Sequence, residues 1–223
     1  IRQNSGKEGV IKLVKNKLKN AMRTAGNNFS VDMYSDGTTA NQINGLQALV
    51  SDAGTGTVGG INSATYTFWK NILQSAAAPL QGGGGITPSA TTMESLMLPM
   101  WLALTRNNDM PDLIVADDTY FTFFDNSQTS LKRYTNTTDV AAGSTSLKYK
   151  GADVVYDSVA SGMPDAHMYF LNTDYIGLSC HRDANWTEVH EKWSVNQDSQ
   201  VLPIIWQGNM TVSNRSLQGV LKA

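Results

Sequence analysis

The sequence has 223 residues, of which 41% are hydrophobic and 16% are charged, and its formal net charge is −2. This is the composition of a globular protein, which excludes a disordered chain, and the length suffices for one large domain or two small ones. No stretch approaches the roughly 20 apolar residues of a membrane span, no secretory leader is visible, and the single cysteine, Cys180, excludes an internal disulfide. The simplest compartment is the cytosol. Because the sequence starts at Ile1 and not at Met, we expect a fragment or a processed product.

Charge is distributed unevenly along the sequence. Residues 1–23 contain seven basic side chains and one acidic side chain, which leaves ten basic and eighteen acidic side chains for the rest. A basic leading segment on an acidic body indicates a surface that meets something negative, either nucleic acid or the acidic face of another copy.

The first predicted element is a long amphipathic helix over residues 5–26. Ser5 and Glu8 have capping-box spacing, and Gly26 is a suitable C-terminal stop. About 20 helical residues span roughly 30 Å, so a helix of this length must lie along another part of the protein or along another molecule. Its apolar side chains recur at three- and four-residue steps and share one side of the helix: Val10, Leu13, Val14, Leu18, Ala21, Met22 and Ala25.

A short apolar run at residues 45–51 leads to two glycine-rich segments. The glycines in residues 53–60 are spaced as in some nucleotide-binding loops, but no Lys-Ser/Thr pair follows. We therefore expect a bend there and not a phosphate-binding loop. Residues 81–86 contain four consecutive glycines and are the best candidate for a domain boundary or hinge.

A second helix is expected over residues 88–106. Thr87 serves as N-cap, Pro88 occupies the first helical position, and Pro99 predicts a kink. Methionines in its apolar stripe are typical core residues, although such stripes can also form an adaptable binding groove. The stripe consists of Met93, Leu96, Met97, Met100, Trp101 and Leu104.

The next segment continues an α+β pattern. Residues 112–116 predict a short buried strand, and Asp117 or Asp118 then caps a third helix over about residues 118–133. From residue 147 onward the pattern changes to strands, with turn residues between them. The expected strands are 147–156, 167–171, 175–180, 186–193 and 200–214, and Pro203 indicates an edge or a bulge in the last one.

Groups that could catalyse a reaction are few. Cys180 and His181 are adjacent, so on a strand they would point to opposite faces and make a poor nucleophile and base pair. Cys180, His181 and His190 do not have the spacing of a zinc site, and His167 is the only other histidine. We therefore predict no catalytic residue, no cofactor and no metal, and a protein that is not an enzyme.

The best carboxylate cluster is formed by Asp117, Asp118 and Asp125. Adjacent carboxylates at a strand end can hold magnesium, which leaves a metal-assisted hydrolase open as an alternative. An Asp between a buried strand and a helix is more often an N-cap. No basic recognition helix and no alternation of basic and aromatic residues indicates sequence-specific binding of nucleic acid.

Several segments, taken in order and with their spacing, resemble the major capsid proteins of tailed bacteriophages, whose fold is shared with encapsulins and the herpesvirus capsid floor. The segments are residues 59–61 leading to Trp69, residues 111–117 (Pro-Asp-Leu-Ile-Val-Ala-Asp) leading to Tyr120, residues 147–155 (Leu-Lys-Tyr-Lys-Gly-Ala-Asp-Val-Val), residues 167–172, and residues 196–221 from Asn-Gln-Asp to Gln-Gly-Val-Leu.

The resemblance implies an α+β fold with a long spine helix, a peripheral-lobe sheet and an α+β axial lobe. Residues 1–80 would hold the spine helix and part of the peripheral lobe, residues 81–185 the axial lobe, residues 186–212 the returning peripheral strands, and residues 213–223 a terminal strand of the axial lobe. In the family, an N-terminal arm and an extended loop precede the spine helix, and both are expected to be missing here.

As function, the resemblance implies a structural subunit of a phage or prophage that self-assembles into an icosahedral shell around double-stranded DNA. Its partners would be copies of itself in pentamers and hexamers, a scaffolding protein, and packaged DNA, which it would bind without sequence specificity. It would not bind a membrane. Its location would be the virion capsid, and the host cytoplasm during assembly. We expect Lys12, Lys15 and Lys19 to contact neighbouring subunits or the DNA in the lumen. A β-rich adhesive tail module remains another alternative, and a solvent-exposed aromatic groove would favour it.

Overall fold

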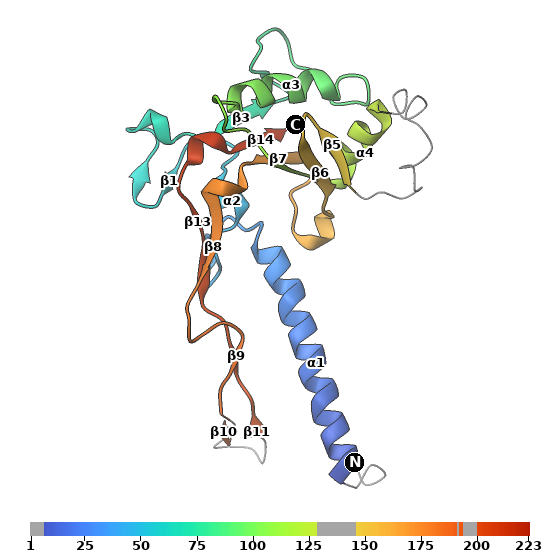
Figure 1. The fold of residues 1–223 in the computed structure, drawn as a ribbon, viewed down its shortest axis with the longest axis vertical. Coiled ribbons are helices and arrows are strands. Elements are labelled where there is room, and N and C mark those ends of the chain that lie inside the picture. The colour runs from blue at the N-terminus through green and yellow to red at the C-terminus, as the bar shows by residue number, and fades with distance from the viewer. Residues whose placement is uncertain (1–6, 129–145, 191, 194–199) are drawn as a thin grey trace.

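The computed structural model describes residues 7–128, 146–190, 192–193 and 200–223, and its body is built on a six-stranded sheet (Figure 1). In chain order the strands are β3 (Ile72–Ser75), β4 (Leu113–Ala116), β5 (Ser146–Tyr149), β6 (Ala152–Tyr156), β7 (His167–Leu171) and β14 (Gly219–Lys222). In space their order is β3-β14-β7-β4-β6-β5. The pairs β3–β14 and β4–β6 are parallel and the other neighbours are antiparallel, so the sheet is mixed.

The central strand β7 shows why the sheet has a core on each face. Successive side chains of a strand point to opposite faces. Met168 and Phe170 accordingly join the cluster under the helices α3 (Met93–Leu104) and α4 (Asp118–Ser127). Tyr169 and Leu171 join the cluster on the other face, which the short helix α2 (Leu46–Leu49) covers. All four side chains are buried.

Helix α3 confirms the methionine stripe as core, because all six predicted stripe residues are buried. The predicted start of this helix was wrong. Thr87 does not cap it, and it begins at Met93 and not at Pro88. The hydroxyl of Thr92 donates to the carbonyl of Thr87 at 2.7 Å and lies 2.9 Å from the hydroxyl of Ser89. Such local hydrogen bonds stabilise a turn in place of a helix. The helix runs through Pro99 to Leu104.

The predicted strand over residues 147–156 is in fact a hairpin. Its two strands, β5 and β6, pair antiparallel, with Tyr149 opposite Ala152. Lys150 and Gly151 connect them, and their φ angles are positive, 48° for Lys150 and 100° for Gly151. Two such residues in succession are the conformation that reverses a chain in a tight hairpin.

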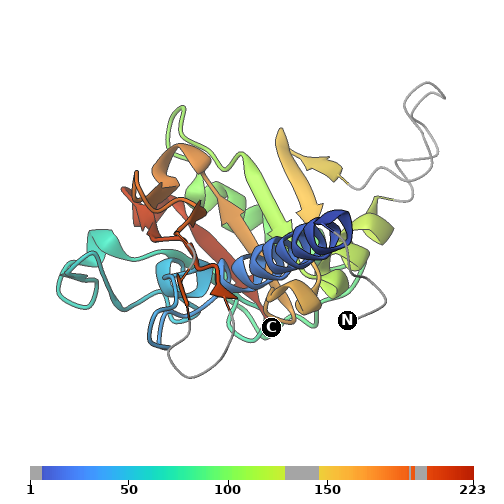
Figure 2. The same ribbon diagram turned by 90° about the horizontal axis from the view of Figure 1, so that it is seen from below.

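Helix α1 (Lys7–Asp32) projects away from the sheet body (Figures 1 and 2). The predicted stop at Gly26 was wrong, because the helix continues through it for six more residues. The Phe29 ring packs edge-on against Trp206, with ring centroids 4.8 Å apart, and also against Trp186 at 5.9 Å. Tertiary contacts of this kind override a weak local stop signal.

Two further contacts fix the base of α1. The Tyr34 hydroxyl, just after the helix, donates to the Asp157 carboxylate at 2.6 Å, and burial, followed by this carboxylate, raises the pKa of the tyrosine. A Cβ added to Gly162 would lie 2.8 Å from the backbone of Val31, and the φ angle of Gly162 is 97°. This glycine, in the turn after η3 (Val159–Ser161), therefore allows the close approach of the helix.

A second projection, which we call the arm, is a two-stranded ribbon over residues 176–212 (Figure 1). It consists of three antiparallel pairs: β8 (Ile176–Cys180) with β13 (Gly208–Val212), β9 (Thr187–Glu188) with β12 (Ile204–Ile205), and β10 (Lys192–Trp193) with β11 (Gln200–Val201). The predicted strands 186–193 and 200–214 are therefore broken into short pieces. One break lies at Pro203, where the ladder is interrupted as the proline indicated.

A lateral loop, residues 53–71, extends from the body on the side of β3 (Figures 1 and 2). It contains β1 (Thr57–Val58), β2 (Ile61–Asn62) and the turn η2 (Thr67–Trp69). The indole N–H of Trp69 donates to the Val58 carbonyl at 3.1 Å, which holds the loop together.

The segment boundaries expected near residues 81, 186 and 213 stay predictions. Two strand pairs join different expected segments, β3 with β14 and β8 with β13. Among the described residues, no helix combines the length and the apolar character needed to cross a membrane.

Candidate functional site

The carboxylate cluster at the start of α4 is an N-cap. One Asp117 oxygen accepts the Tyr120 N–H at 3.0 Å, and the other accepts the N–H groups of Ala166 at 2.9 Å and Thr119 at 3.4 Å. Asp117 is fully buried, and burial raises its pKa although these donors act in the opposite direction. The prediction of a cap is confirmed.

The structure does not gather the proposed metal ligands. Asp118 is exposed in the first turn of α4, and Asp125 lies two turns further along. Within the described part of the chain, no group of three or more His, Cys, Asp or Glu side chains is placed to hold a metal ion. Cys180, His181 and His190 are all exposed on the arm.

One histidine does have a charged partner, which the sequence did not indicate. His167 Nε2 lies 2.9 Å from an Asp52 carboxylate oxygen, and its Nδ1 lies 2.6 Å from the Asp165 carbonyl. Burial lowers the pKa of His167, but the bonds to Asp52 and Asp165 outweigh burial and raise it. The hydrogen bond from His167 lowers the pKa of Asp52. The pair ties the loop after α2 to β7.

Arg215 also holds the loop that follows α2. Its guanidinium is completely buried and donates to three backbone carbonyls, those of Leu49 at 2.6 Å, Thr55 at 3.3 Å and Gly56 at 3.5 Å. Burial lowers the pKa of this arginine. These bonds anchor the root of the lateral loop to η5 (Arg215–Leu217), which leads into β14.

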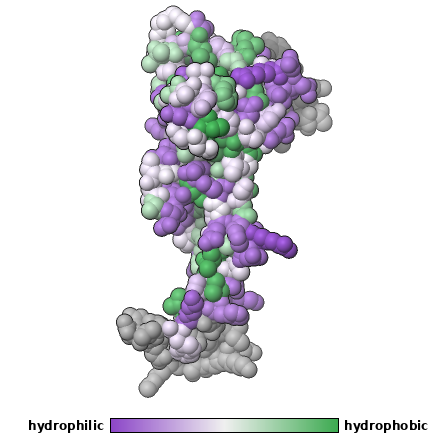
Figure 3. All heavy atoms as spheres, turned by 90° about the vertical axis from the view of Figure 1, so that its left-hand side faces the viewer, coloured by the Kyte–Doolittle hydropathy of each residue, from purple (hydrophilic) through white to green (hydrophobic). Residues whose placement is uncertain are grey.

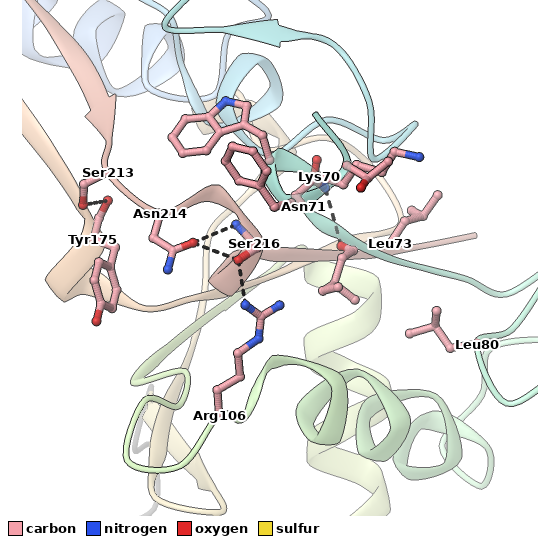
Figure 4. A pocket seen from close by; sticks show the side chains of 13 residues that line it. Lys70, Asn71, Leu73, Leu80, Arg106, Tyr175, Ser213, Asn214 and Ser216 are labelled. Atoms are coloured by element: carbon pink, nitrogen blue, oxygen red, sulfur yellow. Dashed lines mark hydrogen bonds between the residues drawn. The ribbon is translucent and has the colours of Figure 1, made fainter. Parts of the chain in front are cut away.

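A cleft of about 910 Å³ lies between the lateral loop and η5 (Figure 4). Phe68, Trp69 and Leu73 contribute apolar surface to it, and Leu80 lies at its edge. Its polar end is ordered by hydrogen bonds: Arg106 Nη1 donates to the Ser216 hydroxyl at 3.0 Å, and this hydroxyl donates to Asn214 Oδ1 at 2.8 Å. The cleft is open to solvent and combines an aromatic wall with a polar end.

The predicted apolar side of α1 is not buried by the rest of the chain. Leu13 and Val14 are 50% and 55% exposed, and Met22 is also exposed. The arm has the same property, since its exposed apolar residues include Trp193 at 67%, together with Val201, Leu202 and Ile205. Figure 3 shows hydrophobic surface on the projecting part of the molecule beside hydrophilic surface. Exposed apolar surface of this extent typically marks a contact site for another molecule.

The basic residues of α1 lie beside and among its apolar residues. Lys15, Lys19 and Arg23 follow one another at four-residue steps and are exposed. Lys12 lies three residues before Lys15 in the same helix, in turns of which only the backbone is described. Lys15 and Met22 are seven residues apart and so share one side, and the projecting helix therefore offers both apolar and basic side chains to its surroundings.

Comparison with solved structures identifies the type of fold. The structure matches a chain from the capsid asymmetric unit of cyanophage A-1(L) with a TM-score of 0.60. The match covers 94% of this chain and 69% of that chain, at 18% sequence identity. The chain has a phage-capsid fold. No protein-family profile and no curated protein sequence matches it.

A capsid fold accounts for the arrangement of the described residues. The similarity extends over nearly the whole chain, so it includes both the sheet body and the projections. Within this fold the structure places Asp117 as the N-cap of α4. The exposed apolar surfaces of α1 and the arm are the candidate functional site.

Proposed function

We propose that this chain is the major capsid subunit of a tailed bacteriophage or prophage, and that it assembles with copies of itself into an icosahedral shell around double-stranded DNA. The fold similarity to a cyanophage capsid chain supports a shell protein. In this proposal α1 is the spine helix, the arm completes a peripheral lobe, and the six-stranded sheet with α3 and α4 forms the axial lobe.

The observation that carries the proposal is the exposed apolar side of α1. A helix in water gains most of its stability from packing of its apolar face. In α1 that packing is present at Phe29, near the body, but Leu13 and Val14 remain half exposed. Burying such side chains contributes up to about 1.5–3 kcal/mol each. Neighbouring copies in a closed shell can supply this burial many times over.

The proposal is tested by producing the protein from its complete gene, alone and together with the products of the adjacent genes. Negative-stain electron microscopy should show closed shells of uniform diameter in at least one of the two preparations. A monomer that persists at high concentration in both preparations, as measured by analytical ultracentrifugation, contradicts the proposal.

Lys12, Lys15 and Lys19 are proposed to contact either neighbouring subunits or the packaged DNA. The last two are exposed on one side of α1, and the segment that carries all three is strongly basic. Changing all three to Gln should lower shell yield if they contact subunits, or lower the DNA content of filled particles if they face the lumen. The control is Lys148→Gln with Lys150→Gln on the body. Unchanged shell yield and DNA content in the triple variant contradict this assignment.

One observation favours a second candidate, the adhesive tail module. The cleft in Figure 4 has an aromatic wall, and Phe68 beside it is 67% exposed. Exposed aromatic side chains at a cleft are common in recognition sites. An adhesive module gives no role to the exposed apolar sides of α1 and the arm, so we favour the shell subunit.

A further inference from the structure

The aromatic cleft lies at one end of the six-stranded sheet. Three large apolar side chains are exposed around it, Tyr66 at 53%, Phe68 at 67% and Leu80 at 48%. The rings of Tyr66 and Phe68 pack together with centroids 6.0 Å apart. Lys70 is the only charged residue in residues 53–81, and it is exposed. At the far end of the cleft, Arg106 donates to Ser216, and Asp109, three residues after Arg106, carries the opposite formal charge. This end of the sheet is therefore apolar and weakly basic.

The opposite end of the sheet carries a second apolar surface. Tyr156, at the end of β6, is half exposed, and its ring lies 5.4 Å from that of Phe121 on α4. Val159 in η3 is also nearly half exposed. Figures 1 and 2 place this end of the body away from the lateral loop in two perpendicular views.

The charges around this second surface are mostly acidic. Asp118 and Asp165 are exposed, and Asp157 is half-buried at the end of β6. The basic residues nearest in sequence are Lys148 and Lys150. Lys148 pairs with Asp153 at 3.3 Å, and Lys150 lies over the Tyr149 ring. Among the described residues, negative charge thus predominates around Tyr156, whereas Lys70 stands beside the cleft.

We propose that the cleft beside β3 receives the Phe121–Tyr156 surface of a second copy, with Lys70 facing the acidic residues around Tyr156. The proposal rests on the proposed function and names a contact within it. A cleft of about 910 Å³ is large enough for one or two aromatic side chains, and aromatic residues are the usual anchors of protein interfaces. Opposite charges at the rim would select the register of the two copies.

The geometry of this contact makes it head-to-tail. Its two halves are different surfaces, and they lie near opposite ends of the strand order β3-β14-β7-β4-β6-β5. β3 and β6 are four strand intervals apart in this order, and a spacing of about 4.8 Å per interval separates the two surfaces by roughly 19 Å, so one copy can use both at once. A contact between unlike surfaces builds a ring if its rotation closes. The lateral loop, anchored by Arg215, then reaches from each subunit to the next within a ring.

Cysteine cross-linking tests the contact in assembled protein. The exposed Cys180 is first changed to Ser, and two pairs are introduced separately: Phe68→Cys with Tyr156→Cys, and Lys70→Cys with Asp118→Cys. After treatment with a short bis-maleimide, each double variant should give a ladder that ends at the ring size on a denaturing gel. A mixture of the two single variants of a pair should give dimers only. The control pair is Leu102→Cys on the exposed face of α3 with Tyr156→Cys, for which no ladder is expected.

The outcomes separate this contact from the proposed function. Shells that form normally but give no ladder from either pair overturn the head-to-tail contact and leave the shell subunit intact. Dimers from a single variant alone indicate like-to-like contact and also overturn it. If the Phe68→Cys and Tyr156→Cys pair prevents assembly, the Lys70→Cys and Asp118→Cys pair still tests the contact, because both of these residues are exposed. Absence of any particle from the unmodified protein and from all variants counts against the shell function itself.

Discussion

In β7 four consecutive side chains, from Met168 to Leu171, are buried within one chain, whereas in α1 Leu13 and Val14 of the predicted apolar side are half exposed. Both segments have a row of apolar residues that the sequence predicts to be packed. The sheet body buries its apolar residues and so stabilises the subunit, whereas α1 and the arm leave apolar residues exposed to solvent. The same sequence signal can therefore indicate a core within a chain or a contact between chains, and four substitution experiments test which of the two applies to each segment.

The largest effect is expected in the core. Phe170 is fully buried at the centre of the sheet, so Phe170→Ala should lower the free energy of unfolding of the unassembled protein by about 3–5 kcal/mol. Leu13→Ser with Val14→Ser should change it by less than about 0.5 kcal/mol, because these side chains are half exposed. Denaturant unfolding followed by circular dichroism measures both. Similar losses in the two variants would remove the distinction between body and projection.

The next effect concerns Arg215. Arg215→Met keeps an extended side chain of similar length but leaves the carbonyls of Leu49, Thr55 and Gly56 without this donor, and should cost about 2–4 kcal/mol. The control is Arg182→Met, since Arg182 is exposed on the arm. Equal stability of the two variants would show that the lateral loop does not depend on the buried guanidinium.

Loss of the α4 cap should have a smaller effect. Asp117→Ala removes the acceptor of three backbone N–H groups and should lower the free energy of unfolding by about 1–2 kcal/mol, whereas Asp118→Ala should be close to neutral. Thermal unfolding with and without added Mg²⁺ or Mn²⁺ checks the alternative role. A rise in Tm that depends on metal and on Asp117 would support a metal site instead of a cap.

The smallest effect is the pH dependence of the His167–Asp52 pair. The pKa of His167 is raised, so its stabilisation is complete below its unfolded value of about 6.5 and is lost as the pH rises through the folded value. The pKa of Asp52 is lowered, so its part is lost only as the pH falls through the folded value, below about 4.

Between about pH 6 and pH 9 the free energy of unfolding should therefore decrease with rising pH. Since the Asp52 side chain is 41% exposed, the change should be only a few tenths of a kcal/mol. His167→Gln should flatten this dependence, and His190→Gln on the arm should not. An unchanged slope in His167→Gln would show that the pair contributes no pH dependence.

Local signals in the sequence predicted much of the body. Apolar runs identified β4 and β7, the methionine stripe identified the buried face of α3, and Asp117 was recognised as a cap. The hairpin at Lys150 and Gly151 was missed, although the glycine between two short runs was a local turn signal.

Long-range contacts were beyond the reach of local patterns. His167 and Asp52 are 115 residues apart, and Arg215 meets carbonyls about 160 residues earlier, which have no side-chain signature. The extension of α1 past Gly26 depends on Phe29 meeting Trp186 and Trp206 of the arm. The aromatic cleft, too, exists only because the lateral loop folds back against η5.

In the proposed function, the exposed apolar side of α1 serves assembly and not the stability of the subunit. It is tested most directly by comparing shell yield and subunit stability in Leu13→Ser with Val14→Ser in the complete protein. The matched control is Asn16→Ser with Asn20→Ser, which changes exposed polar residues of the same helix. We predict at least a tenfold fall in shell yield, equivalent to about 1.4 kcal/mol, with unfolding of the unassembled subunit unchanged. Normal shells from the apolar variant, or an equal loss in the control, would contradict the account.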